Sequence, residues 1–266
     1  MTSIMKPKKI LICIAVYDTE ENCRFRYTEE TFWSLSDNID PRNTDVVFIN
    51  NASCDETTEF LNTRASSVFH VISLENNIGT AEAINVGIEK YAKEGDFIIK
   101  MDNDCVVYRR DWPNVMKACL ESDPSIGVLG LKRKDLPNSP EHEQYPTTLQ
   151  FANREHGQPW HVIEECSDII GTCQMFSPKL IEKVGYLYQP GLYGYDDVLM
   201  CERSRLAGFR NAFYPSIEID HIDTGGDAYT EYKKRYAGTQ IPAFNKAIEG
   251  YQSGEKSIYY NPFESQ

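Results

Sequence analysis

Two aspartates separated by one residue, Asp102 and Asp104, directly follow the apolar segment 96–101. At the end of a strand, two carboxylates with this spacing can point into one cleft. Mg²⁺ and Mn²⁺ prefer carboxylate and phosphate oxygens, so such a pair can hold a diphosphate through a divalent ion, and one carboxylate can accept a ribose hydroxyl. Taken alone, Asp-Asn-Asp is explained better as a surface turn.

A second acidic pair, Asp196 and Asp197, begins a predicted helix over 196–207. A carboxylate at a helix N-terminus is stabilised by the helix dipole, so one of the two can serve as the N-cap. A carboxylate that faces a cleft can instead act as a general base toward an acceptor hydroxyl. We expect one residue to cap and the other to face the cleft.

His221 follows the predicted last strand, 211–219. It could complete the ligand shell of a metal ion, although a lone histidine at a strand end is more often a hydrogen-bonded structural residue.

Two Asn-x-Gly elements, at Asn77 to Gly79 and at Asn85 to Gly87, are the remaining polar motif in the first half of the chain. Gly79 lets the backbone turn sharply or approach a ligand. Asn85 could hydrogen-bond a buried loop or a nucleotide base. Helix capping and close helix–sheet packing explain the same residues equally well.

Apolar segments and helical patterns alternate four times in the first hundred residues. Strands are predicted over 9–16, 45–49, 69–74 and 96–101, and helices over 28–35, 56–65 and 81–92. This alternation predicts an α/β fold, with a Rossmann-like, mostly parallel sheet flanked by helices. Ligands bind beyond the carboxyl ends of such strands. Three of these ends carry the polar clusters at Asp18, 50–55 and 102–104, which we therefore expect to converge.

The second half of the chain is less regular. Segment 132–160 is predicted to be a loop or short hairpin, followed by a strand over 168–176, a helix over 178–184 and the segments named above. Residues 223–236 are polar, with Gly225 and Gly226 permitting flexibility, and 226–266 are predicted to form a helical or loop appendage to a single domain. Its aromatic residues could form a cap or the interface of a homo-oligomer.

Acidic residues outnumber basic ones, 40 to 27, and the net charge is −13. This balance argues against binding duplex DNA or an anionic membrane surface. The longest apolar run, 10–17, is shorter than the roughly 20 residues of a membrane-spanning helix. The eight cysteines form no CxxC pair, which favours the reducing cytoplasm and gives no support to a zinc site.

In this order, the motifs resemble those of family 2 glycosyltransferases with the GT-A fold, over roughly residues 9–225. The resemblance rests on Ala15-Val16-Tyr17-Asp18, Asn50-Asn51-Ala52-Ser53-Cys54-Asp55, Asn77 with Gly79, Asn85 with Gly87, Asp102-Asn103-Asp104, Gly171 to Phe176, Tyr195-Asp196-Asp197-Val198 with Arg203 and Gly208, and His221.

The resemblance implies an inverting transfer of a sugar from a nucleoside-diphosphate sugar, with Mn²⁺ or Mg²⁺ as cofactor. It places the metal on Asp102, Asp104 and His221, gives Asp102 a ribose contact and makes Asp197 the catalytic base. The nucleotide would contact Tyr17, Asp18, Asn50, Asp55, Asn77, Gly79, Asn85 and Asp102. Residues 1–225 would form the GT-A domain, with a nucleotide-binding half (1–110) and an acceptor half (111–225), and 226–266 would be an extension. Part of the acidic excess would then meet in one cleft: Asp18, Asp55, Asp102, Asp104, Asp196 and Asp197.

Two positions depart from the family pattern. Asn50 replaces an aspartate expected to read the base, and an amide donates as well as accepts, so the identity of the base is open. Asp196 replaces a glutamate, and Leu199 replaces a further acidic residue.

Other functions fit the sequence less closely. A nucleotidyltransferase that makes nucleotide sugars would need a Gly-rich basic loop after the first strand, where 17–22 is acidic and lacks glycine. A non-catalytic nucleotide-sugar-binding module stays open because of Asn50 and Asp196. The expected acceptor is a saccharide or a lipid-linked saccharide, ahead of a modified nucleic-acid base.

Overall fold

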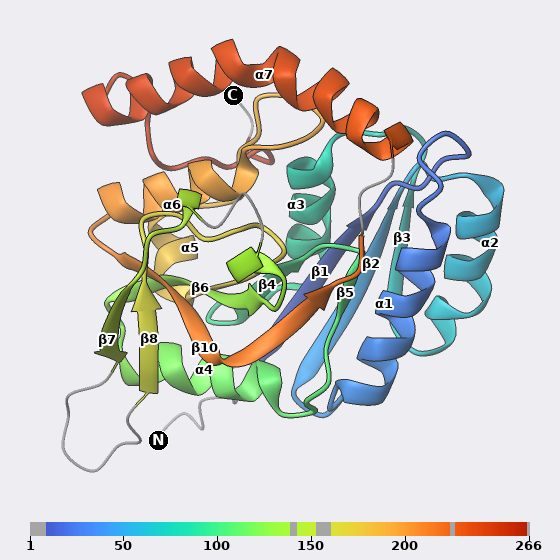
Figure 1. The fold of residues 1–266 in the computed structure, drawn as a ribbon, viewed down its shortest axis with the longest axis horizontal. Helices are drawn as coiled ribbons and strands as arrows, with labels where there is room; N and C mark the ends of the chain where they lie inside the picture. The colour runs from blue at the N-terminus through green and yellow to red at the C-terminus, as the bar shows by residue number, and fades with distance from the viewer. Residues whose placement is uncertain (1–8, 139–142, 153–160, 224–226, 265–266) are drawn as a thin grey trace.

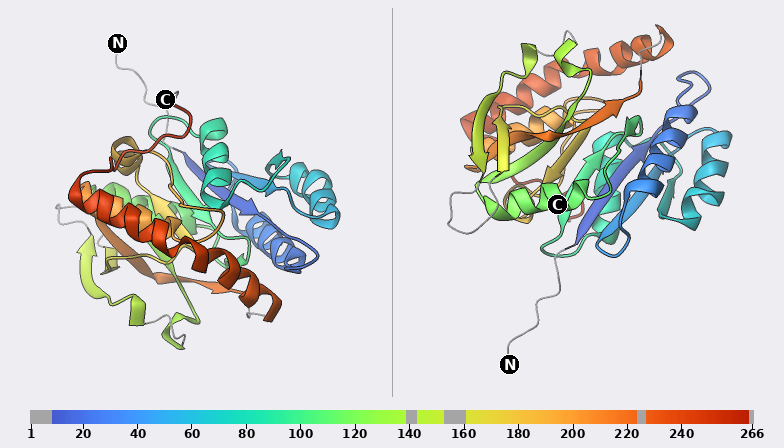
Figure 2. Two further views of the ribbon diagram at one scale, coloured as in Figure 1. Left: turned by 90° about the horizontal axis from the view of Figure 1, so that it is seen from above. Right: turned by 60° about the horizontal axis from the view of Figure 1, so that its bottom comes forward.

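One mixed sheet, covered by helices on both faces, organises the chain (Figure 1; Figure 2). The computed structural model describes residues 9–138, 143–152, 161–223 and 227–264. The strand order is β3-β2-β1-β4-β9-β6-β10-β8-β7, and β5 pairs with β10. The predicted α/β class, with a mostly parallel central sheet, is confirmed.

The first half follows the predicted alternation. The strands are β1 (Ile10–Val16), β2 (Thr44–Asn51), β3 (His70–Leu74) and β4 (Phe97–Met101), all parallel to their neighbours in this half. The helices between them are α1 (Phe25–Asn38), α2 (Asp55–Thr63) and α3 (Thr80–Tyr91), with a 3-10 turn η1 (Ala65–Ser67) before β3. The carboxyl ends of these parallel strands therefore lie at one edge.

Strand β1 shows why this sheet is buried on both faces. Successive side chains of a strand point to opposite faces. Ile12 and Ile14 accordingly pack into one apolar cluster with residues of α1, α2 and α4 (Trp112–Ser122), while Leu11 and Cys13 join a second cluster with residues of α3. A nearly continuous apolar run is the sequence pattern that this burial requires.

The second half extends this sheet with both parallel and antiparallel pairs of strands. It contains β5 (Cys105–Val106), β6 (Ile126–Arg133), β7 (Thr148–Ala152), β8 (His161–Glu165), β9 (Cys173–Phe176) and β10 (Arg210–His221). The helices are α4, α5 (Pro178–Val184) and α6 (Asp196–Leu206), with a 3-10 turn η2 (Leu136–Asn138). No element was predicted between 105 and 131, where β5, α4 and most of β6 lie. The segment 132–160, predicted as a loop or short hairpin, contains β7, whose antiparallel partner β8 begins just after that segment.

The predicted strand over 168–176 is wrong in its first part, since β9 begins at Cys173. The residues just before β9 make hydrogen bonds with side chains instead of with a neighbouring strand. The Ile169 carbonyl accepts from Gln174 Nε2 (2.6 Å), and the Gly171 N–H donates to Asp197 Oδ2 (2.9 Å). These residues form a loop that faces the carboxyl ends of the strands.

The predicted C-terminal appendage contains the helix α7 (Asp227–Ser253). Gly225 and Gly226, which were expected to permit flexibility, lie outside the described residues. Figure 1 shows α7 running across the top of the molecule, and it packs against α6. Arg203 of α6 is fully buried and donates to the carbonyls of Ile258 (2.7 Å), Tyr186 (2.8 Å) and Val184. The residues after α7 are thereby tied to the rest of the fold. Across the described ranges, no helix is both long and apolar enough to cross a membrane.

Candidate active site

A polar cleft of about 510 Å³ opens where β1, β2 and β4 end, and the loop before α6 closes its other side. Four of the six aspartates expected to converge line it: Asp102, Asp104, Asp196 and Asp197. The expectation is wrong for the other two. Asp55 is exposed at the start of α2, and Asp18 is fully buried beneath the cleft.

Asp18 serves a buried hydrogen-bond network. Its Oδ2 accepts from Thr28 (2.6 Å) and Thr57 (3.3 Å), and its Oδ1 accepts from Asn103 Nδ2 (3.0 Å). Burial raises the pKa of the Asp18 carboxyl, and these hydrogen bonds oppose the rise. The network joins the ends of β1 and β4 and holds the middle residue of the Asp-Asn-Asp motif. Asp102 and Asp104, on either side of that residue, both line the cleft.

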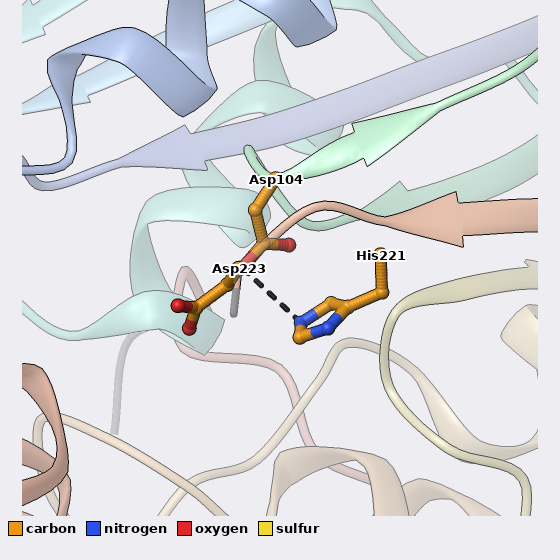
Figure 3. A group of neighbouring side chains, drawn as sticks. All are labelled: Asp104, His221 and Asp223. Atoms are coloured by element: carbon orange, nitrogen blue, oxygen red, sulfur yellow. Dashed lines mark ion pairs between the residues drawn. The ribbon is translucent and has the colours of Figure 1, made fainter. Parts of the chain in front are cut away.

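Asp104 meets His221 and Asp223 in a group that could hold a metal ion (Figure 3). One ligand atom from each lies within 4.8 Å of the others, and the distance from His221 Nε2 to Asp104 Oδ2 is 3.3 Å. β10 brings His221 here because its end pairs with β5, directly after Asp104. Two carboxylates and an imidazole are a donor set that suits Mn²⁺. Asp223 was not among the predicted ligands, and its place two residues after His221 was the available signal.

Arg24 and the carboxylates govern the charge of this group. Burial would raise the pKa of the Asp104 carboxyl, but the hydrogen bond from His221 and the charges of His221 and Arg24 hold that pKa well below its ordinary value. Burial lowers the pKa of the His221 imidazole, and Asp104 outweighs that effect and raises it. Arg24 also lies 3.1 Å from Asp223. No sequence motif marked Arg24 for this position.

Lys100 of β4 lies between the acidic groups on the two sides of the cleft. Its Nζ is 2.8 Å from Asp102 Oδ1 and 3.7 Å from Asp196 Oδ2, and it donates to the Gly171 carbonyl (2.7 Å). Burial lowers the pKa of the Lys100 ammonium, but Asp102, Asp196 and Asp197 together raise it above its ordinary value. Sequence reasoning missed Lys100 because it sits within an apolar strand.

Asp197 has the geometry and the pKa of a candidate base. Its Oδ2 accepts from the Gly171 N–H (2.9 Å) and its Oδ1 from the Val198 N–H (2.8 Å). Burial and the neighbouring Asp196 carboxylate raise its pKa to about 6, although Lys100 opposes the shift. The expected division between a cap and a cleft residue is wrong. Tyr195 is the N-cap and makes no capping bond through its side chain, and Asp196 and Asp197 both line the cleft.

The residues expected around the nucleotide base do not all lie in the cleft. Tyr17 lines the cleft. Asn50 does not, because its amide shapes the loop into α2: Nδ2 donates to Thr58 Oγ1 (2.9 Å) and Oδ1 accepts from the Ser53 N–H (2.9 Å). The neighbouring Asn51 lines the cleft in its place. Adjacent residues of a strand face opposite sides. A prediction that is wrong by one position therefore selects a residue that supports the loop instead of one that lines the cleft.

Asn77 lines the cleft, whereas Gly79 and Asn85 shape its border. Asn77 Oδ1 accepts from the Gly79 N–H (2.9 Å) and from Asn51 Nδ2 (2.9 Å). Gly79 has φ +94°, a conformation that favours glycine. Asn85 was expected to hydrogen-bond either a buried loop or a nucleotide base, and it bonds a buried loop. Its amide pairs with the N–H (3.0 Å) and C=O (2.9 Å) of Leu187.

Comparison with protein families now identifies the class of the chain. A model described as glycosyl transferase family 2 matches residues 12–185, well over half of the 266 residues. The chain belongs to glycosyl transferase family 2, a family of transferase enzymes, as its motifs predicted. No curated protein sequence matches it.

Solved structures share the fold at low sequence identity. The mannosyltransferase PcManGT from Pyrobaculum calidifontis, in complex with GDP-Man and Mn²⁺, has a TM-score of 0.61 and 16% identity, covering 87% of this chain and 61% of that one. S. aureus TarS 1–349 has a TM-score of 0.56 and 18% identity, covering 79% and 59%. GalNAc-T7 with UDP, GalNAc and Mn²⁺ has a TM-score of 0.58 and 14% identity, covering 80% and 44%. These likenesses show the GT-A fold, and the present chain spans less than two thirds of each of these structures.

Proposed function

We propose that this protein is an inverting, divalent-metal-dependent glycosyltransferase that moves a sugar from a nucleoside-diphosphate sugar to an acceptor hydroxyl. The observation that carries the proposal is one cleft with two distinct acidic groups. Asp104, His221 and Asp223 form a possible cation site on one side, and Asp197, with a pKa near 6, faces the other. The similarity to structures solved with UDP-GlcNAc, or with GDP-Man and Mn²⁺, supports a donor of this class.

The cation site fits Mn²⁺ or Mg²⁺ by its donor atoms. Asp104, His221 and Asp223 would hold the ion, and Asp102 would stand beside it toward the ribose. The bound ion would supply Lewis-acid neutralisation of the departing diphosphate. Tyr17 and Asn77 line the donor side of the cleft, in the proposed nucleotide-binding half 1–110.

Asp197 would act on the acceptor. Its carboxylate removes the proton from the acceptor hydroxyl, whose oxygen bonds to the anomeric carbon as the bond from that carbon to the donor phosphate breaks. A single displacement inverts the configuration and requires no protein nucleophile. A base with a pKa near 6 is mostly ionised at neutral pH and still accepts a proton readily.

The acceptor side is proposed for 111–225, with the extension 226–266 as a further wall. Tyr145, Tyr193 and Lys233 line the cleft there. Tyrosine rings can pack against sugar faces, and we propose a saccharide or a lipid-linked saccharide as acceptor. The eight free cysteines agree with a proposed location in the cytoplasm.

The test has two steps. A thermal-shift screen of UDP, GDP and their sugar conjugates, with and without Mn²⁺, identifies the donor, because a ligand that binds the folded state raises Tm. The Asp197→Asn variant is then compared with the wild type for donor binding and for transfer or slow donor hydrolysis. Turnover should be lost while donor binding is kept. Absence of stabilisation by every nucleotide would refute the proposal, and near-normal turnover of the variant would refute the assignment of the base.

A further inference from the structure

Arg24 contacts two of the three residues of the proposed cation site, Asp104 and Asp223. It precedes α1, is only 4% exposed and lines the cleft. One guanidinium nitrogen, Nη2, lies 2.5 Å from Asp104 Oδ2, and the other, Nη1, lies 3.1 Å from Asp223 Oδ2. A single side chain thus bridges the two carboxylates proposed to hold the metal.

A guanidinium group and a divalent ion are alternative partners for these carboxylates. Arginine stays protonated in proteins, so its charge cannot be removed to make room for the ion. Two cations that share the same carboxylate oxygens would also repel each other strongly at a buried position. An ion that binds Asp104 Oδ2 beside His221 therefore competes with Arg24 for that oxygen. Asp223 keeps a second basic neighbour, since Lys233 Nζ lies 3.5 Å from its Oδ2.

The displaced guanidinium needs another anion. Its fork of N–H donors matches two oxygens of a phosphate group. A donor diphosphate bound beside the ion would offer such oxygens within the same cleft. Metal without nucleotide would take the Asp104 oxygen from Arg24 and supply no phosphate oxygen in exchange.

We propose that Arg24 is the resident cation of this site in the absence of metal and that it transfers to the diphosphate when metal and nucleotide bind. This inference rests on the proposed function. It makes the two ligands cooperative: each must bind more tightly in the presence of the other, by the same factor. Arg24 is a positioning residue in this scheme, because it decides when the centre accepts an ion.

The test measures Mn²⁺ binding by electron paramagnetic resonance and calorimetry, with Mn²⁺ alone and with Mn²⁺ plus saturating UDP or GDP. Wild type should bind Mn²⁺ alone weakly and at least about tenfold more tightly with the nucleotide, within the range typical of coupled sites. Arg24→Gln should bind Mn²⁺ alone at least about tenfold more tightly than wild type and should lose most of the coupling. Arg24→Lys keeps the charge without the fork and should fall between them.

Arg26→Gln is the matched control, since Arg26 is exposed on α1 and pairs with Glu30. It should bind both ligands as wild type does. Circular dichroism verifies that each variant is folded. If Arg24→Gln does not fold, the test rests on the coupling measured in wild type and on its decrease in Arg24→Lys. Equal Mn²⁺ affinity with and without nucleotide in wild type, or unchanged coupling in the Arg24 variants, would overturn the proposed role of Arg24. Neither result would overturn the proposed function. If wild type binds no Mn²⁺ under any condition, the metal-dependent function fails together with the role of Arg24.

Discussion

The ammonium group of Lys100 lies 2.8 Å from the carboxylate of Asp102 and donates a hydrogen bond to the carbonyl of Gly171, whose N–H binds Asp197. One buried lysine thus connects the donor side of the cleft with the candidate base. Its charge also partly balances three buried or half-buried carboxylates.

Replacing Lys100 with methionine should destabilise the fold and raise the pKa of Asp197 above 6. Lys100 opposes the rise of that pKa, so its removal leaves the effects of burial and Asp196 less opposed. Removing one partner of a buried ion pair costs about 3–5 kcal/mol. Urea unfolding at pH 7.5 measures the stability. The acid limb of the pH–activity profile should move to higher pH. Lys93→Met, on an exposed residue, should change neither.

Replacing Asp197 with asparagine should stabilise the folded protein at pH 7.5. The folded-state pKa of about 6 lies above the ordinary 3.8, so ionising Asp197 is unfavourable in the folded state. The stability that the protonated form contributes is complete below pH 3.8 and is lost as the pH rises through 6. The gain at pH 7.5 should be about 1–3 kcal/mol and should shrink below pH 6. Urea unfolding at several pH values measures this gain in stability, and Asp37→Asn, at an exposed residue, is the control. A gain that does not depend on pH would contradict the raised pKa of Asp197.

Replacing Asp223 with asparagine, or His221 with alanine, should abolish stabilisation by Mn²⁺ plus nucleotide. Each change removes one of three candidate ligand groups. A ligand at a hundred times its Kd stabilises a protein by about 2.7 kcal/mol, which thermal shift detects easily. Asp220→Asn is the control, because Asp220 pairs with Lys134 (2.8 Å) and lies outside the ligand group. A full Mn²⁺ response in the Asp223 and His221 variants would rule out this ligand set.

Replacing Arg203 with methionine should loosen the C-terminal segment and lower stability. The guanidinium donates to three backbone carbonyls, including that of Ile258, and these would lose their donor. We expect a loss of about 3–5 kcal/mol in urea unfolding. Limited proteolysis should also cleave after α7 sooner than in wild type. Arg205→Met, which removes a partly exposed pair with Glu202, should cost no more than about 1 kcal/mol; equal losses in the two variants would disprove the anchoring role.

The sequence by itself determined the family and the α/β class. Apolar strands that end in polar loops are local patterns, and the parallel strands bring those ends to one edge whatever the details of packing. Asp102, Asp104 and His221 follow predicted strands and Asp197 begins a predicted helix, so the sequence marked all four as candidates. The structure places them in one cleft.

Only the tertiary structure decided which polar residues face the cleft and which support it. Asp18 and Asn50 carry the same signal as their neighbours, yet both are used inside the fold. Lys100, Arg24 and Asp223 come from segments far apart in the chain, so no local pattern could group them. Their roles depend on distances of 2.5 to 3.1 Å between charged atoms, and such distances arise only when β4, the start of α1 and the end of β10 pack together.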